Sequence, residues 1–179
     1  MNITVYCASS FGHDPAFADE ARVFGAWIGS NRHTLIYGGT NVGLMGLIAG
    51  TVLDEGGRVI GVLPDILSDR EPPSDRLSEF FRVETMAQRK AKMIELGEVF
   101  VAMPGGPGTL EELSEIMSLV KLGTPPGYLY LLNVNGYYDE LVASFERMLA
   151  HGFMTSEMRA YLKVAQSADE LTHMLETQE

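Results

Sequence analysis

Short apolar runs alternate with longer amphipathic segments along most of the chain. The apolar runs are rich in Val, Ile, Leu and Tyr, and they predict buried strands at 3–7, 34–37, 58–63, 98–103, 128–132 and 163–165. Segments with apolar residues at helical spacing follow them and predict helices at 15–28, 44–53, 86–96, 110–120, 138–150 and 168–176. This alternation favours an α/β fold whose parallel strands are joined by right-handed crossovers, with helices on both faces of the sheet.

The segment 64–80 interrupts the alternation. It holds three prolines and many charged residues, and it shows no clear periodicity. Long irregular segments in compact domains are usually functional lids or mobile loops, so we expect one here. No repeat, low-complexity tract or linker divides the sequence, and we therefore expect a single domain over residues 1–179.

The net charge of −11 argues against nucleic acid or an anionic membrane surface as the main partner, because both need a basic footprint. No apolar run approaches the ~20 residues of a membrane span. Cys7 is the one cysteine, which excludes an intrachain disulfide and suits a reducing compartment. The first residues form a predicted strand without a basic region, so we expect no signal peptide and a cytoplasmic protein.

Three glycine-bearing turns follow predicted strands, at Gly12, at Gly38-Gly39 and at Gly105-Gly106. Ligands of open parallel sheets bind beyond the carboxyl ends of the strands, so we expect these turns to meet in one crevice. None of the turns matches a P-loop or the G-x-G-x-x-G fingerprint of dinucleotide-binding proteins. The four histidines are scattered, and with a single cysteine they make no metal pattern.

The turn at 104–112 carries the strongest chemical signal. A buried strand ends at Pro104, glycines follow, and a helix continues through Leu113 and Ile116 with Thr109 as its predicted N-cap. The N-terminus of a helix offers free N–H groups and a partial positive charge, which together bind anions. We infer that the anion is the phosphate of a nucleotide.

Two motifs then indicate a family. Residues 104–112 read P-G-G-x-G-T-x-x-E, and residues 86–90 read M-x-x-R-K. Together they resemble the LONELY GUY (LOG) family, the cytokinin-activating phosphoribohydrolases that were long labelled lysine decarboxylases. The resemblance extends over nearly the whole chain and implies a Rossmann-like domain. One departure lies in the second glycine turn, where Thr40 stands in place of a usual third glycine.

The resemblance implies hydrolysis of the N-glycosidic bond of an adenosine 5′-monophosphate, often N6-modified, to free base and ribose 5-phosphate. It implies no metal or organic cofactor, and it implies a homodimer or larger homo-oligomer. Arg89 and Glu112 match its catalytic positions. The positions that match its substrate contacts are Glu71, Arg89, Lys90, Gly105, Gly106, Pro107, Gly108, Thr109, Leu110, Glu111, Glu112 and Ser118.

Each proposed catalytic residue has a structural alternative. Glu112 stands three residues after Thr109, so it is also placed to complete a capping box. Arg89 lies on the apolar helical stripe of Met86 and Met93, where a charge needs a ligand, a structural carboxylate or an escape to the rim. From the pattern alone, Lys90 and Glu71 are ordinary solvated residues.

Two other functions remain open at this point. A nucleotide-binding protein without catalysis fits the same fold, although the intact Arg89 and Glu112 speak against it. A lysine decarboxylase needs a lysine that forms a Schiff base with pyridoxal phosphate. None of the four lysines, at 90, 92, 121 and 163, has a recognisable context for that role.

Overall fold

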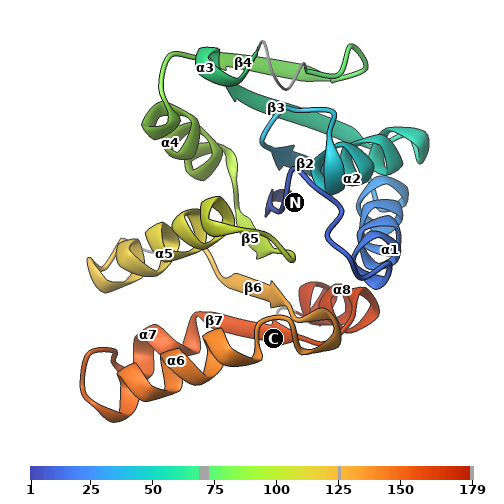
Figure 1. The fold of residues 1–179 in the computed structure, drawn as a ribbon. Helices are drawn as coiled ribbons and strands as arrows, with labels where there is room; N and C mark the ends of the chain where they lie inside the picture. The colour runs from blue at the N-terminus through green and yellow to red at the C-terminus, as the bar shows by residue number, and fades with distance from the viewer. Residues whose placement is uncertain (69–72, 125, 178–179) are drawn as a thin grey trace.

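The computed structural model describes residues 1–68, 73–124 and 126–177, and its centre is a seven-stranded sheet in the order β4-β3-β2-β1-β5-β6-β7 (Figure 1). All neighbouring strands are parallel. The strands are β1 (Asn2–Tyr6), β2 (Thr34–Tyr37), β3 (Arg58–Pro64), β4 (Glu79–Val83), β5 (Val99–Ala102), β6 (Leu129–Leu132) and β7 (Leu162–Ala165). The helices are α1 (Ala16–Ser30), α2 (Gly43–Asp54), α3 (Asp65–Ser68), α4 (Met86–Leu96), α5 (Pro107–Lys121), the 3-10 turn η1 (Val134–Gly136), α6 (Asp139–Ala150), α7 (Ser156–Ala160) and α8 (Ala168–Thr177). The predicted α/β class is confirmed.

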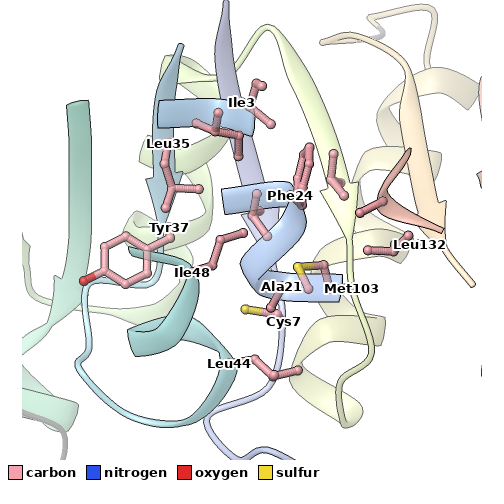
Figure 2. Close-up of a cluster of buried hydrophobic side chains, with 14 of the residues drawn as sticks. Ile3, Cys7, Ala21, Phe24, Leu35, Tyr37, Leu44, Ile48, Met103 and Leu132 are labelled. Atoms are coloured by element: carbon pink, nitrogen blue, oxygen red, sulfur yellow. The ribbon is translucent and has the colours of Figure 1, made fainter. Parts of the chain in front are cut away.

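Each face of the sheet carries its own hydrophobic core, because successive strand residues point to opposite sides. On one face, Ile3 of β1 packs with Phe24 of α1 and Ile48 of α2 (Figure 2). Buried residues of α8 belong to the same cluster. On the other face, Tyr6 of β1 packs in a cluster with Ile116 of α5 and with residues of α4 and α6. Helices therefore cover both faces, as expected. None of the helices in the described ranges is long and apolar enough to cross a bilayer.

The edge strand β4, the short helices α3 and α7 and the 3-10 turn η1 were not predicted. β4 pairs with β3 from Ile60↔Glu79 to Pro64↔Val83, inside and just beyond the segment expected to be irregular. Its Phe80 is 40% exposed, and two of its five residues are charged. An edge strand needs no continuous apolar run, since only one neighbour and part of one face are buried, and that is why the pattern did not reveal it.

The three glycine-bearing turns meet near β1, where the strand order changes direction. The Ala8 N–H donates to the Pro104 carbonyl at 3.3 Å, and the Ala8 carbonyl accepts from the Met45 N–H at 3.3 Å. A Cβ at Gly43 would lie 2.3 Å from the backbone of Ser10, so a glycine is needed where the second turn crosses the first. The predicted shared crevice is therefore present at the switch point of the sheet.

Candidate active site

One cavity of about 310 Å³ opens at this switch point. Its walls come from the β1–α1 turn, the first turns of α4 and α5, and single residues of α2 and α3. The lining residues are Cys7, Ala8, Ser9, Ser10, Met45, Leu67, Met86, Arg89, Lys90, Gly106, Pro107, Gly108, Thr109, Glu111 and Glu112. The two sequence motifs, which are separated along the chain, therefore line the same cavity.

Helix α5 begins at Pro107, with Gly106 as its N-cap and no side chain capping it. The prediction that Thr109 is the N-cap was wrong. Proline is favoured at the first helical position because its fixed φ suits the helix and its missing N–H has no partner there anyway. Since glycine has no capping side chain, the N–H groups of Gly108 and Thr109 at the cavity wall stay uncapped, as an anion site requires.

Two tyrosines fix the backbone just before this helix. The Tyr138 hydroxyl donates to the Met103 carbonyl at 2.6 Å, and the Tyr137 hydroxyl donates to the Gly105 carbonyl at 2.6 Å. Gly105 is also needed for space, because a Cβ there would lie 2.1 Å from Thr109 Oγ1. The tyrosines follow β6, far from the turn along the chain, so no local pattern could show that they hold it.

Glu112 lies in the second turn of α5 and is 8% exposed. Its capping-box alternative is contradicted, since no side chain caps α5; a capping box is found instead at the start of α4, between Thr85 and Gln88. Within the described ranges its carboxylate receives no hydrogen bond and no ion pair. Burial raises its pKa to about 7, against the opposing effect of the nearby Arg89 charge. At neutral pH, both protonation states are therefore populated.

Arg89 lies in the first turn of α4 and is 7% exposed. Its Nη2 lies 3.9 Å from the Met45 sulfur, and its Nη1 lies 4.0 Å from the Met86 sulfur. In the part of the chain that the structure describes, its Nε has no hydrogen-bond partner and no carboxylate lies within 4.0 Å of the guanidinium. Arg89 therefore neither reaches the rim nor forms an ion pair with any described residue, and its charge is available to a ligand.

Lys90 is the next residue, and it is paired. Its Nζ lies 2.8 Å from Glu111 and 3.0 Å from Glu115, both on α5. Hydrogen bonds to Glu111 and then Glu115 raise its pKa. Lys90 is the lysine that lines the cavity, and a lysine held as an ammonium between two carboxylates does not fit a Schiff base, which needs a free neutral amine.

The remaining predicted residues lie at different distances from the cavity. Gly105 faces a neighbouring pocket of about 220 Å³ on the other side of the turn, and Leu110 points outward at 38% exposure. Ser118 is exposed further along α5, where its hydroxyl donates to the Ser114 carbonyl at 2.8 Å, and it does not line the cavity. Glu71 lies outside the described residues.

Sequence reasoning missed the apolar wall formed by Met45 and Leu67. Met45 lies in the helix that follows the second glycine turn, which is the only signal that could have pointed to it. Leu67 belongs to α3, inside the segment expected to be a lid or loop. Met45 reads as an ordinary core residue of its helix, and nothing in the irregular segment singles out Leu67.

The family model described as "Possible lysine decarboxylase" matches residues 45–175. The chain is 42% identical over 174 residues to a rice protein (Oryza sativa subsp. japonica) named probable cytokinin riboside 5′-monophosphate phosphoribohydrolase LOGL1, covering 97% of this chain and 78% of the relative. It is 40% identical to the Arabidopsis thaliana cytokinin riboside 5′-monophosphate phosphoribohydrolase LOG1, again over 97% of this chain and covering 82% of the relative.

Solved structures agree on the fold. The molybdenum cofactor carrier protein of Chlamydomonas reinhardtii superposes with a TM-score of 0.73 at 19% identity, covering 98% of this chain and 95% of the other. The molybdenum cofactor binding protein of Rippkaea orientalis gives 0.70 at 18% identity, covering 98% and 94%. These likenesses show a shared Rossmann-like fold, whereas the sequence matches are specific, and by them this chain belongs to the LONELY GUY family.

Proposed function

We propose that this protein hydrolyses the N-glycosidic bond of N6-modified adenosine 5′-monophosphates, releasing free base and ribose 5-phosphate. The relatives' named activity supports the substrate class. One observation carries the proposal: Arg89 and Glu112 are both buried in one cavity, beside the uncapped start of α5. Neither of them forms an ion pair with a described residue. AMP itself is a second proposed substrate, which makes nucleotide salvage testable beside cytokinin release.

The reaction needs a binding site for the 5′-phosphate and a group that stabilises the positive charge that develops on the ribose. The N–H groups at the start of α5 bind the 5′-phosphate. As the bond between the anomeric carbon and the base nitrogen breaks, positive charge grows on the ribose, and the Glu112 carboxylate stabilises it. Glu112 takes a proton from the attacking water, whose oxygen bonds to the anomeric carbon, while the base leaves with the electron pair of the broken bond. The departing base nitrogen then takes up one proton from solvent and Glu112 returns one to solvent, so that free base is released and the carboxylate is restored. Its pKa of about 7 suits a general base at neutral pH.

Arg89 acts as a fixed cation, because a guanidinium does not give up its proton in this pH range. It either binds the phosphate or stabilises the negative charge that develops on the departing base. Substrates separate these roles. If Arg89 binds the phosphate, Arg89→Ala lowers turnover of AMP far more than any residual turnover of adenosine; if it stabilises the base, both fall by the same factor.

The direct test is release of free base from isopentenyl-AMP, AMP and adenosine, followed by chromatography. We expect release from the monophosphates, little from adenosine, and loss of release in Glu112→Gln and Arg89→Ala. Lys163→Ala, on β7 away from the cavity, is the matched control and keeps the parent rate. Absence of release in the folded parent protein contradicts the proposal, and tight AMP binding by calorimetry in that case supports the non-catalytic alternative.

We further propose that the chain acts as one domain and works in the cytoplasm, as its sequence pattern favours, and that it forms a homodimer, as the family resemblance implies. Light scattering on the purified protein tests the dimer. Mixing the inactive variants Arg89→Ala and Glu112→Gln tests whether sites are shared. Recovery of activity on mixing indicates that one site draws residues from both subunits, and no recovery indicates that each subunit holds a complete site.

A further inference from the structure

The guanidinium of Arg89 occupies the space where a side chain at Gly38 would begin. A Cβ at Gly38 would lie 1.8 Å from Arg89 Nη2 and 3.0 Å from its Cζ. It would also lie 2.7 Å from the Met45 sulfur. The φ of Gly38 lies outside the left-handed region, unlike that of Gly39 at +83°. Gly38 is therefore required for space and not for backbone conformation.

Among the described residues, the side chains that contact the guanidinium directly are uncharged, and Glu112 is the carboxylate whose pKa its charge lowers. Met45 and Met86 place their sulfurs at 3.9 Å and 4.0 Å from its two terminal nitrogens. The Thr40 hydroxyl contacts the Met45 sulfur from behind at 3.9 Å, which orients that side chain. Thioether sulfur is a weak acceptor, so these contacts position the group without neutralising it.

We propose that Gly38, Met45 and Met86 form a neutral seat that holds the Arg89 guanidinium charged, buried and, among the described residues, without an ion pair at the cavity, with Gly38 as a positioning residue for the reaction. The inference rests on the proposed function and goes further, because it assigns roles to three uncharged residues, Gly38, Met45 and Met86, that the proposed reaction does not use. A carboxylate in the same place would hold the guanidinium equally well, but it would compete with the anionic substrate.

The seat makes an unusual prediction for Gly38→Ala. The backbone conformation accepts alanine, and the atoms in the way are the free ends of two flexible side chains. We expect the variant to fold, with a melting temperature within about 5 °C of the parent, while the guanidinium leaves its position. Gly50→Ala on α2 is the matched control, because no atom lies within 4 Å of the added Cβ.

Kinetics distinguish loss of the seat from general damage. We expect Gly38→Ala to lower kcat for base release about 100-fold, as misplacement of a charged group does. In an Arg89→Ala background the same substitution has no further effect, because the group that it displaces is gone. The pH midpoint of the reaction moves upward in Gly38→Ala, since the Arg89 charge that lowers the Glu112 pKa has moved away. An equal loss in both backgrounds overturns the proposal.

A second pair of variants tests the neutrality itself and does not depend on Gly38→Ala folding. Met45→Gln and Met45→Glu have nearly the same shape, but only the latter places a carboxylate beside the guanidinium. With ribose 5-phosphate as the calorimetric probe, we expect Met45→Glu to bind at least about tenfold more weakly than Met45→Gln. Equal binding by the two variants overturns the neutral seat.

Binding also separates this inference from the proposed function. If the parent protein releases no base but Met45→Glu still weakens ribose 5-phosphate binding relative to Met45→Gln, the reaction is wrong and the seat stands. If the parent releases base and neither Gly38→Ala nor Met45→Glu changes release or binding, the reaction stands and the seat is wrong.

Discussion

Where α4 meets α5, two cation–carboxylate groups are built in opposite ways. In the outer group, Lys90 is paired with Glu111 and Glu115 at 2.8 and 3.0 Å. The inner group consists of Arg89 and Glu112, which are the sequence neighbours of Lys90 and Glu111. Both are buried, and neither has an ion pair in the described ranges. Helical geometry turns neighbours by about 100°, so adjacent charges face different surroundings.

The two groups differ in whether their charges are paired, and this difference indicates that one serves stability and the other serves the reaction. The outer group pairs its one cation with two carboxylates whose side chains are 61% and 37% exposed, and ion pairs with exposed carboxylates contribute little. The inner group leaves two charges desolvated, which costs folding free energy that the two hydrophobic cores offset. Such groups persist where a ligand uses them, and perturbed pKa values at a cavity indicate the same. The outer group is therefore a clasp between helices and the inner group the proposed site of reaction.

The largest expected effect is the loss of base release when a residue of the inner group is substituted. Arg89→Ala or Glu112→Gln should lower kcat for base release from isopentenyl-AMP by about 10³-fold, because each removes a charge aimed at the reacting bond or the substrate anion. Lys90→Met is the matched variant in the outer group and should lower it less than tenfold. A loss in Lys90→Met as large as in Arg89→Ala would contradict the division between the groups.

The next effect appears in stability. The pKa of Glu112 is about 7 in the folded protein and about 4.5 when unfolded, so ionisation of this group destabilises the fold increasingly as pH rises from 4.5 through 7. Glu112→Gln should therefore raise the free energy of unfolding at pH 8 by on the order of 3 kcal/mol, and the gain should vanish at pH 4. Urea unfolding at both pH values measures it. Glu111→Gln should show no such gain.

A smaller effect on stability and on base release is expected from removing the helix cap of α4, which carries one residue of each group. The capping box of Thr85 and Gln88 fixes the first turn of α4, which carries Arg89 and Lys90. Thr85→Ala should cost about 1 kcal/mol of unfolding free energy and lower base release severalfold. Thr85→Ser keeps the capping hydroxyl and serves as the control; if it behaves like Thr85→Ala, the cap does not position the site.

The smallest effect belongs to the outer group alone. The Glu111 side chain is 61% exposed, so its ion pair with Lys90 is well screened. Glu111→Gln should lower the unfolding free energy by about 0.5 kcal/mol at low salt and by less in 1 M salt, with base release within about threefold of the parent. A salt-independent loss of activity would place Glu111 in the inner group instead.

Local pattern predicted most of the fold because the central strands are continuous apolar runs and the helices keep one apolar face. It placed β2 and α4 at their observed bounds and the other predicted elements within a few residues. It missed β4, whose burial is partial, and it misplaced the start of α5, where Pro107 outweighs Thr109. Both errors arise where a neighbouring element or a backbone constraint, and not side-chain periodicity, sets the boundary.

By itself, the sequence determined the parallel α/β class, the glycine turn before α5 and, through two motifs, the family and the candidate pair Arg89 and Glu112. Only the tertiary structure decided which charges are paired. It placed Lys90 between two carboxylates, gave Arg89 a neutral seat over Gly38, and raised the pKa of Glu112 by burial. The reason is physical: periodicity fixes which face of an element is buried, whereas pairing and desolvation depend on what a distant part of the chain brings to that face.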